Sequence, residues 1–536
     1  MKFVKISDIT HEHIPDGSMI AVGGVHSHNV PMALIRQIVR LGIKDLTLIG
    51  SISVGLPIDL LVSNKCVKRV LAPYVGFEMW GLAPSFRKAV ETHQIEAPDV
   101  CEAFPVYSLR AGSDGVPFHP FPEGIHQYSD IHKQSDLYKQ VTDPFTQKQL
   151  YAVKAITPDV AIIHAQAATR NGDLIHRGSV VIDHLMASSA KLVIATVEEI
   201  VDEYDPNEIT VPSINVDYII HLPHSAYPTS SHGIYRYDAS EIKNYLEITQ
   251  ADERIKQYLN EINESTEEDY LTSHFKETPL PEVSSLGQTY TISELVAVLF
   301  ARDIKDYELG ICGAVSDIPM AAMQLAERLH APNLRWIAGG SGYINPRGAL
   351  VPSSTDYQMS VSSNARLSMN EVIPVEMEKL DFFFAGGLQI DGVGNTNLAG
   401  IPSEDGWKLR GPGSVGLAFL PRAKRVYLYT LVHNSRSLVK KVSYISGPGH
   451  QQPENPFGGG PSLLITSKCV FRWNVEKFSW ELVSLHPGIE LSDVKESTGF
   501  DFLISEPVPI TKIPTEKELA LLREIDKYGY LRGVSD

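Results

Sequence analysis

A glycine-rich loop follows an apolar strand in the second half of the chain and is the first stretch whose residue types suggest a bound molecule. The segment "HAPNLRWIAGGSGYINPRG" spans residues 330–348 and carries Gly339 and Gly340 directly after its apolar run. Glycine has no Cβ, so the backbone can pass close to a ligand there. Ser341 adds a hydroxyl that could donate to a carbonyl oxygen or act as a nucleophile beside a histidine and an acid, although a plain loop hydroxyl is the simpler interpretation.

Other glycines mark further places for a ligand. Gly23 and Gly24 end an apolar stretch just before Pro31, a position where free amides can face an anion or a carbonyl oxygen, although tight packing alone would also require glycine. A run of three glycines lies in "PFGGGPS", at Gly458, Gly459 and Gly460. Such a run lets an extended ligand lie against bare backbone, or it forms a flexible turn.

Two pairs of histidines could supply two ligands each to a metal ion, but the sequence offers no third ligand at a suitable spacing. His11 and His13 lie in "HEH", and His26 and His28 lie in "HSH". No third ligand follows at metal spacing, so we expect no metal centre. We expect His26 and His28 to be polar residues at the mouth of the first glycine loop, near a substrate.

The elements that would position these residues repeat along the chain. Residues 23–51 can be laid over residues 312–340, and in both a glycine-containing strand end leads to Pro-Met-Ala, a helical stretch and a second apolar strand. Proline is tolerated in the first turn of a helix because its missing N–H would be unpaired there anyway. Each unit is therefore expected to be a right-handed βαβ unit with parallel strands.

A second correspondence between the two halves strengthens the first. The same interval separates Asp159 from Gly172 and Asp381 from Gly394, and both segments run through an apolar strand. Strands rich in Val and Ile that alternate with helices predict the α/β class, with two tandem Rossmann-like domains of mainly parallel sheet flanked by helices. We place the first domain at residues 1–265, a linker at 266–287 and the second domain at 288–536.

Composition excludes several classes of partner. Hydrophobic residues make up 43% of the chain, charged residues 21%, and the net charge is -17, with no run of lysines and arginines. Such a surface repels nucleic acid and anionic membranes. We find neither a secretory signal nor a long apolar stretch, and therefore expect a cytoplasmic protein. Four widely spaced cysteines, Cys66, Cys101, Cys312 and Cys469, are expected to be buried free thiols.

Several segments together resemble the class I coenzyme A transferases, most closely the glutaconate CoA-transferase type. The first half resembles the α subunit of that family through "GGVHSHNVPMALIRQIV" and "SVVIDHLMASSAKLVIATVEEIV", and the second half resembles the β subunit through "DFFFAGGLQIDGVGNTN" and "PFGGGPSLLIT". The resemblance implies a fused α–β enzyme that processes acyl-CoA and moves CoA between carboxylic acids through a glutamyl-CoA thioester. It also implies a CoA thioester as substrate without a permanently bound cofactor, a small or ring-derived carboxylic acid as co-substrate, and self-association of the fused chain.

The resemblance also assigns roles to the glycines. It places the acyl-CoA thioester and the pantetheine tail at Gly386, Gly387 and the glycines at 458–460, and it assigns oxyanion binding to the amides of the glycine loops. The β-subunit glutamate of the family is expected directly after the strand that follows "HAPNL". Gly339 occupies this position, and no acidic residue follows before Asp356.

Some members of the superfamily that lack this glutamate cleave thioester or C–C bonds with a glutamate from the α half, which gives an alternative function. The candidates here are Glu102 in "DVCEAFPVYSLR" and Glu78 in "VGFEMWGLAP". An apolar setting raises the pKa of a carboxyl and makes it a better base near neutrality. Pairing with a buried cation or a helix N-terminus is the other interpretation for Glu102, and a surface turn for Glu78. An inactive CoA-binding protein is a further alternative.

Overall fold

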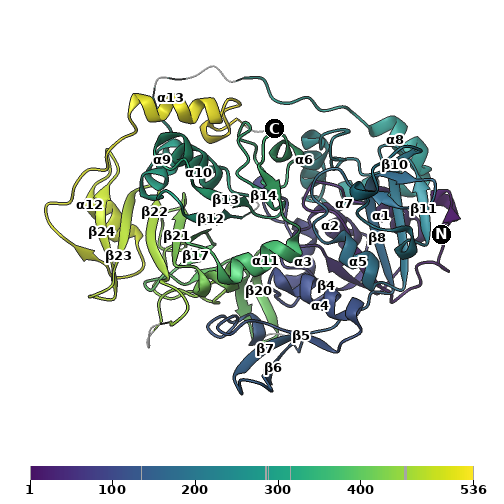
Figure 1. The fold of residues 1–536 in the computed structure, drawn as a ribbon, viewed down its shortest axis with the longest axis horizontal. Coiled ribbons are helices and arrows are strands. Elements are labelled where there is room, and N and C mark those ends of the chain that lie inside the picture. Colours follow the sequence, from purple (N-terminus) through teal and green to yellow (C-terminus); the bar gives the residue numbers. More distant parts are fainter. Residues whose placement is uncertain are drawn as a thin grey trace.

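Two large β-sheets, one in each half of the chain, organise the molecule. The structure, a computed structural model, describes residues 2–133, 136–283, 287, 289–313, 315–451 and 455–534. Figure 1 shows the first half at the right, in purple to teal, and the second half at the left, in green to yellow. The predicted α/β class with two tandem domains of mainly parallel sheet is confirmed.

The sheet of the first half is parallel along its main path. Its strands follow the order β1 (Lys2–Phe3), β11 (Tyr218–His221), β10 (Leu192–Val201), β8 (Val160–Thr169), β2 (Met19–Val22), β3 (Leu46–Gly50) and β4 (Val67–Leu71), with β9 (Leu174–Ile175) antiparallel to β8. Every residue of β8 is buried. A strand covered on both faces is expected at the centre of a parallel sheet.

The sheet of the second half adds antiparallel strands to a parallel centre. Its order is β15 (Ala365–Arg366), β14 (Tyr343–Ile344), β13 (Arg335–Ala338), β12 (Leu309–Cys312), β16 (Phe382–Ala385), β21 (Arg425–Thr430), β22 (Pro461–Thr466), β23 (Cys469–Asn474), β24 (Ser479–Leu485) and β25 (Leu503–Ile504). The strands from β13 to β22 are mutually parallel, whereas β22, β23 and β24 form an antiparallel meander.

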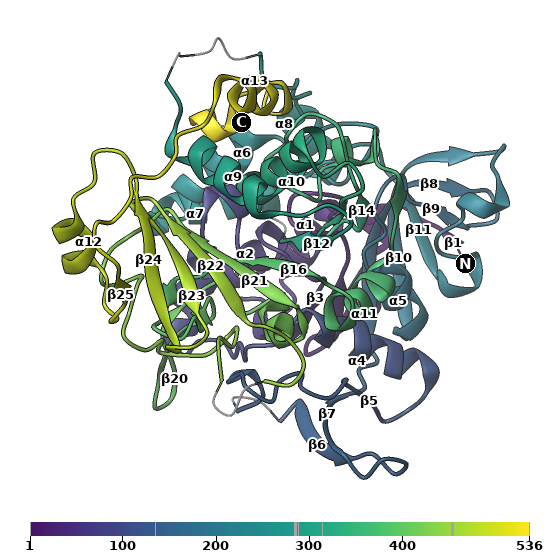
Figure 2. The same cartoon turned by 60° about the vertical axis from the view of Figure 1, so that its left-hand side comes forward.

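Helices flank these sheets. The first half contains α1 (Met32–Leu41), α2 (Leu56–Ser63), α3 (Pro84–Glu91), α4 (Ala103–Asp114), α5 (Asp183–Ser189), α6 (Ala239–Ile248), α7 (Asp252–Glu264) and α8 (Glu267–His274). The second contains α9 (Ile292–Asp303), α10 (Asp317–Leu329), α11 (Met369–Glu378), α12 (Leu491–Ser497) and α13 (Glu516–Ile525). In Figure 2, α9 and α10 lie beside α13 near the C-terminus.

Smaller antiparallel pieces complete the fold. The first half contains a three-stranded sheet of β5 (Phe118–Pro120), β7 (Gln149–Lys154) and β6 (Tyr138–Thr142), which projects at the bottom of both views in Figures 1 and 2. The second half contains the hairpins β17 (Gln389–Ile390) with β18 (Thr396–Asn397) and β19 (Gly400–Ser403) with β20 (Gly406–Arg410).

The sequence repeat corresponds to two matching βαβ units. β2, α1 and β3 form the first unit, and β12, α10 and β13 form the second, each with parallel strands as predicted. Pro31 precedes the first residue of α1, whereas Pro319 is the third residue of α10, which begins earlier, at Asp317. Both positions lie where a helix has no internal partner for a backbone N–H, so proline costs little in either.

The repeated aspartates have the same role in both halves. The Asp159 Oδ2 atom accepts a hydrogen bond from the backbone N–H of Met19 at 2.9 Å, and Asp381 Oδ2 accepts one from Leu309 N–H at 2.8 Å. Each aspartate therefore fixes the start of the neighbouring strand, β2 in one half and β12 in the other. The equal spacing in the sequence reflects this shared structural role.

A buried ion pair joins the region expected to begin the linker to the first half. Glu267, the first residue of α8, is 2% exposed. Its Oε1 atom accepts a hydrogen bond from Arg36 at 2.6 Å, and its Oε2 atom accepts one from Arg40 at 2.7 Å. Both arginines lie on α1, so these contacts hold α8 against the first βαβ unit.

We expect Glu267→Gln to lower the free energy of unfolding by about 2 kcal/mol, because it leaves the buried Arg36 guanidinium and the partly buried Arg40 guanidinium without their counter-charge. Urea unfolding of both proteins measures the difference. Glu268→Gln, one position further on α8 and exposed, is the matched control and is expected to change stability by less than about 0.5 kcal/mol. Equal stability of the Glu267 variant and the parent protein would contradict the assignment.

Candidate active site

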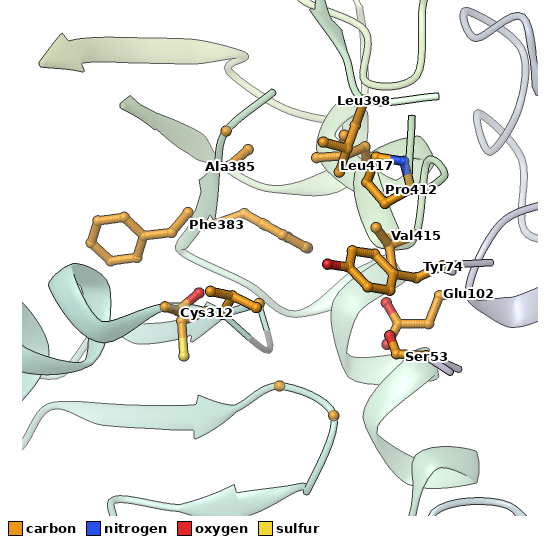
Figure 3. Close-up of a pocket in the computed structure, with 18 of the residues that line it drawn as sticks. Ser53, Tyr74, Glu102, Cys312, Phe383, Ala385, Leu398, Pro412, Val415 and Leu417 are labelled. Atoms are coloured by element: carbon orange, nitrogen blue, oxygen red, sulfur yellow. The ribbon is translucent and has the colours of Figure 1, made fainter. Parts of the chain in front are cut away.

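A cavity of about 310 Å³ lies between the two halves, and both halves contribute to its wall. Figure 3 shows Ser53, Tyr74 and Glu102 on one side and Cys312, Phe383 and Ala385 on the other. The strand ends and loops that surround it include Gly339, Gly340 and Gly386 among the predicted ligand-binding glycines. Ligand sites in α/β proteins form at such strand ends.

Glu102 lies in this cavity, immediately before α4. Its backbone N–H donates to the carbonyl oxygen of Val415 at 2.9 Å, so the second half fixes its position. Its side chain passes close to Gly416, where an added Cβ would lie 2.8 Å from Glu102 Oε2. Burial raises the pKa of Glu102 to about 7. A carboxyl with this pKa exchanges protons readily near neutral pH, as a general base must.

A second carboxyl, Glu376 of α11, lines the same cavity from the other half. Glu376 is 3% exposed, and its Oε2 atom has no hydrogen-bond partner within the described residues. Burial and the nearby Glu102 carboxyl raise its pKa well above the usual range. The two carboxyls therefore disfavour each other's charged form, which is the behaviour of a pair that shares a proton.

Sequence reasoning missed Glu376, although a signal was present. On α11 the buried positions Met369, Val372, Ile373 and Met377 have helical spacing, and Glu376 falls within their stripe. A glutamate on the apolar face of a helix is uncommon, since Glu is rarely buried without a partner. This pattern, rather than any motif, could have identified the residue.

Glu78, the other predicted carboxyl, lies in the cavity wall at a strained backbone position. Its φ angle is 52°, which is rare for a residue with a side chain. The Ser353 hydroxyl donates a hydrogen bond to Glu78 Oε1, and the Nδ1 atom of His26 lies 3.8 Å from the same oxygen. Burial raises the pKa of Glu78 to about 8, although the Ser353 hydrogen bond acts in the opposite direction.

The Glu78 carboxyl makes stability depend on pH. Its pKa rises from 4.5 to about 8 on folding, so the folded state favours the protonated form. The resulting stabilisation is complete below about pH 4.5 and is lost as the pH rises through about 8. We expect Glu78→Gln to be more stable than the parent protein by roughly 2 kcal/mol at about pH 8.5, with little difference at about pH 4.5.

Urea unfolding across this pH range tests the expectation. The exposed Glu96→Gln variant is the control for loss of a carboxylate, and its stability should follow that of the parent protein at every pH. If Glu78→Gln and the parent protein lose the same amount of stability as the pH rises, the Glu78 carboxyl is not the cause of the pH dependence.

His26 and His28 differ in their surroundings. His26 lines the cavity, and neither of its ring nitrogens has a hydrogen-bond partner within the described residues. Burial lowers its pKa to about 3, which keeps the ring neutral. His28 instead pairs with the hydroxyl of Ser230 at 2.7 Å. In the described part of the chain, no three His, Cys, Asp or Glu side chains are placed to hold a metal ion.

Gly339 fills the position where the family glutamate was expected, and the backbone around it explains why no side chain is present. Its N–H donates to the carbonyl oxygen of Cys312 at 3.0 Å. A Cβ at this position would lie 2.1 Å from that oxygen, far inside van der Waals contact. The two strand ends approach so closely that only glycine fits.

The remaining predicted residues lie outside the cavity wall. The Gly24 N–H donates to Asp183 Oδ1 at 3.1 Å, and a Cβ on Gly23 would meet the same oxygen at 2.9 Å. The Ser341 hydroxyl donates to the carbonyl oxygen of Ser354 at 2.5 Å. Gly387, Gly458 and Gly459 adjoin backbone carbonyls of their own half, whereas Gly460 adjoins the ring of His450. Contact of these glycines with CoA stays a prediction.

The projecting sheet supports the residue before Glu102. Tyr138 OH accepts a hydrogen bond from the Cys101 N–H at 3.0 Å, and Cys101 Sγ lies 3.3 Å from His126 Nε2. Burial raises the pKa of the Cys101 thiol to about 12, so it stays protonated. All four cysteines are free and buried, as predicted. Spacing in the sequence could not show that Tyr138 and His126 reach Cys101.

Comparisons with known proteins agree on one family. The model of the family described as "Coenzyme A transferase" matches residues 3–222 of this chain. One of the two subunits of the 3-oxoadipate CoA-transferase from Pseudomonas knackmussii is 31% identical over 44% of this chain and 84% of its own length. An uncharacterized protein of Archaeoglobus fulgidus is 32% identical over 48% of this chain, but the match spans only 58% of that protein.

Two further similarities concern a hydrolase and the fold. The IpdA subunit of the cholesterol ring-cleaving hydrolase of Rhodococcus jostii is 26% identical over 50% of this chain and 94% of that subunit. The crystal structure of the acyl-CoA transferase YdiF from Escherichia coli O157:H7 superposes over 95% of both chains with a TM-score of 0.67 and 16% identity, which shows a shared fold. No described helix is long and apolar enough to cross a membrane.

Proposed function

Because this chain belongs to the coenzyme A transferase family and is an enzyme that acts on acyl-CoA, we propose that it moves CoA between carboxylic acids with Glu102 as the reacting carboxyl. The single observation that supports this role is the position of Glu102. It lies in the cavity between the halves, 8% exposed, and its side chain forms no hydrogen bond within the described residues. Its oxygens therefore remain available to a substrate.

Transfer through Glu102 would proceed in balanced steps. An oxygen of the Glu102 carboxylate attacks the thioester carbonyl carbon, the C–S bond breaks, and CoA leaves as the thiolate. The thiolate then attacks the Glu102 carbonyl carbon of the resulting anhydride, which releases the first acid as its carboxylate and leaves a glutamyl-CoA thioester. The second carboxylic acid takes CoA by the reverse of these steps.

Hydrolysis of the thioester is the second candidate, and the geometry at Gly339 favours it. Gly339 stands where the resemblance leads us to expect the covalent carboxyl of the family, and a Cβ there would lie 2.1 Å from the Cys312 carbonyl oxygen, which supports a route without that carboxyl. In this route Glu102 takes a proton from water, the hydroxide attacks the thioester carbonyl, and the departing CoA thiolate recovers the proton. The similarity to a ring-cleaving hydrolase subunit supports the related possibility of hydrolytic C–C cleavage of a cyclic acyl-CoA.

Chemical trapping separates these routes. The protein is incubated with butyryl-CoA, treated with borohydride or hydroxylamine, and digested for peptide mass spectrometry. A modified Glu102 supports CoA transfer, whereas release of free CoA without a modified residue supports hydrolysis. If a panel of linear and cyclic acyl-CoA thioesters gives neither CoA release nor an adduct nor ring opening, the proposed function is wrong.

Size-exclusion chromatography with light scattering tests a further part of the proposal, that the fused chain self-associates. The fusion already joins the two halves that form the cavity wall, so association would pair whole copies of this two-half unit. We expect a mass of about twice 59.2 kDa. A monomer at all concentrations would contradict this part of the proposal and leave the catalytic part unaffected.

A further inference from the structure

Two carboxyls near each other in the cavity wall have unequal surroundings. Glu102 comes from the first half, its side chain forms no hydrogen bond within the described residues, and Figure 3 shows its carboxyl directed into the cavity. Glu376 comes from α11 of the second half and is 3% exposed. Its Oε2 atom is buried without a hydrogen-bond partner in the described part of the chain. The two carboxyls therefore differ in how easily each can carry a charge.

The surroundings of Glu376 favour its protonated form. A carboxylate that leaves water needs a cation or several donors to offset the loss of hydration. Among the described residues that line the cavity, none is Lys or Arg. Arg422 ends the 3-10 helix Gly416–Arg422, which packs against α11, but its Nε donates to the carbonyl oxygen of Met377 at 2.8 Å. An ionised Glu102 nearby makes a second charge still less favourable.

We propose that Glu376 is the general acid of this enzyme, which as a neutral carboxylic acid gives its proton to the CoA sulfur when the C–S bond breaks, while Glu102 acts as the ionised partner. Two carboxyls of one site whose surroundings separate their proton affinities commonly divide the roles of acid and base in this way. This inference rests on the proposed function, because it assigns the cavity to the thioester of an acyl-CoA.

The proton balance closes in both candidate routes. In hydrolysis, Glu102 takes a proton from water, the hydroxide attacks the thioester carbonyl, and the departing CoA sulfur takes the proton of Glu376. The proton held by Glu102 then passes to Glu376, which restores both groups. In CoA transfer, the departing sulfur takes the Glu376 proton, and Glu376 takes it back when the sulfur attacks the anhydride formed on Glu102.

The other titratable groups around the cavity define the rival acid. Glu78 also lines the wall, and burial raises its pKa to about 8, so it too loses a proton above neutrality. His26 stays neutral, since burial lowers its pKa to about 3. Burial raises the pKa of each thiol and phenol on the surrounding elements, which keeps these groups protonated at neutral pH: Tyr74, Cys101, Tyr107, Cys312 and Tyr429.

The pH profile of kcat tests the inference, with release or transfer of CoA from butyryl-CoA to acetate measured between about pH 6 and about pH 10. In the parent protein the rate should rise as Glu102 ionises, with a pKa of about 7, and fall when Glu376 loses its proton at higher pH. Glu376→Gln has no proton to give, so its maximal kcat should drop about a hundredfold and the alkaline fall should disappear.

Two further variants complete the experiment. Glu376→Met places an apolar side chain in the buried stripe of α11, so it should fold and show the same loss as Glu376→Gln. Both variants should keep KM within about threefold of the parent value, because the proton is needed only when the C–S bond breaks. Glu378→Gln, exposed on the same helix, is the matched control and should keep the full rate and the alkaline fall.

Each result decides a stated point. A parent rate that does not fall at alkaline pH would overturn the inference, even if neither Glu376 variant folded. An alkaline fall that persists in Glu376→Gln and disappears in Glu78→Gln would assign the proton to Glu78 and also overturn it. A parent protein without CoA release or transfer at any pH would overturn the proposed function itself, whereas the other two results leave that function standing.

Discussion

Glu102→Gln is expected to lower kcat by about a thousandfold, because both the transfer and the hydrolytic route need an ionisable carboxyl at this position. The amide has nearly the same shape, so binding of the substrate should change little and KM should stay within about threefold. Steady-state release or transfer of CoA from butyryl-CoA measures both constants. A rate within about tenfold of the parent protein would exclude Glu102 as the reacting group.

The same variant should keep its fold, which separates loss of chemistry from loss of structure. Burial raises the pKa of Glu102 to about 7, so folding already disfavours the ionised carboxylate, and a neutral amide removes this cost at higher pH. We therefore expect the free energy of unfolding of Glu102→Gln to equal or exceed that of the parent protein at about pH 8. Glu96→Gln, exposed and remote from the cavity, should retain full activity.

The framework of the protein was predictable because it follows from local patterns. Apolar strands, glycine turns and proline-started helices repeat with equal spacing, and the repeated aspartates Asp159 and Asp381 bind the starts of equivalent strands. These features depend on backbone geometry that each half forms in the same way. Two carboxyls of the cavity, Glu78 and Glu102, were also predicted, since apolar neighbours in the sequence became a buried setting in the structure.

The rest of the site depends on contacts between distant segments, which local patterns do not contain. Glu376 reaches the cavity only because α11 places it near Glu102. The Gly24 amide looked free in the sequence, but Asp183, far along the chain, accepts its hydrogen bond. A long-range partner of this kind changes a candidate anion site into a structural contact. Residue types thus indicated candidate groups, while the tertiary structure decided which of them line the cavity.

Restoring a glutamate at the position expected from the family should fail. In Gly339→Glu the new Cβ would lie 2.1 Å from the carbonyl oxygen of Cys312, and this oxygen belongs to the backbone of β12, which cannot turn away as a side chain would. We expect the free energy of unfolding to fall by about 4 kcal/mol or more, and Gly339→Ala to lose nearly as much, because the clash begins at Cβ. Urea unfolding measures both variants.

Gly313→Ala provides the matched control in the adjoining loop. A Cβ at Gly313 would lie 3.5 Å from its nearest neighbour, the Ser316 hydroxyl, so this variant should stay within about 1 kcal/mol of the parent protein. Gly339→Glu could instead fold with normal stability and form a borohydride-sensitive adduct at residue 339. This result would contradict our claim that the close approach of the strand ends leaves no room for a side chain there. The reacting carboxyl would then be at residue 339, which would contradict our proposal that Glu102 is the reacting group.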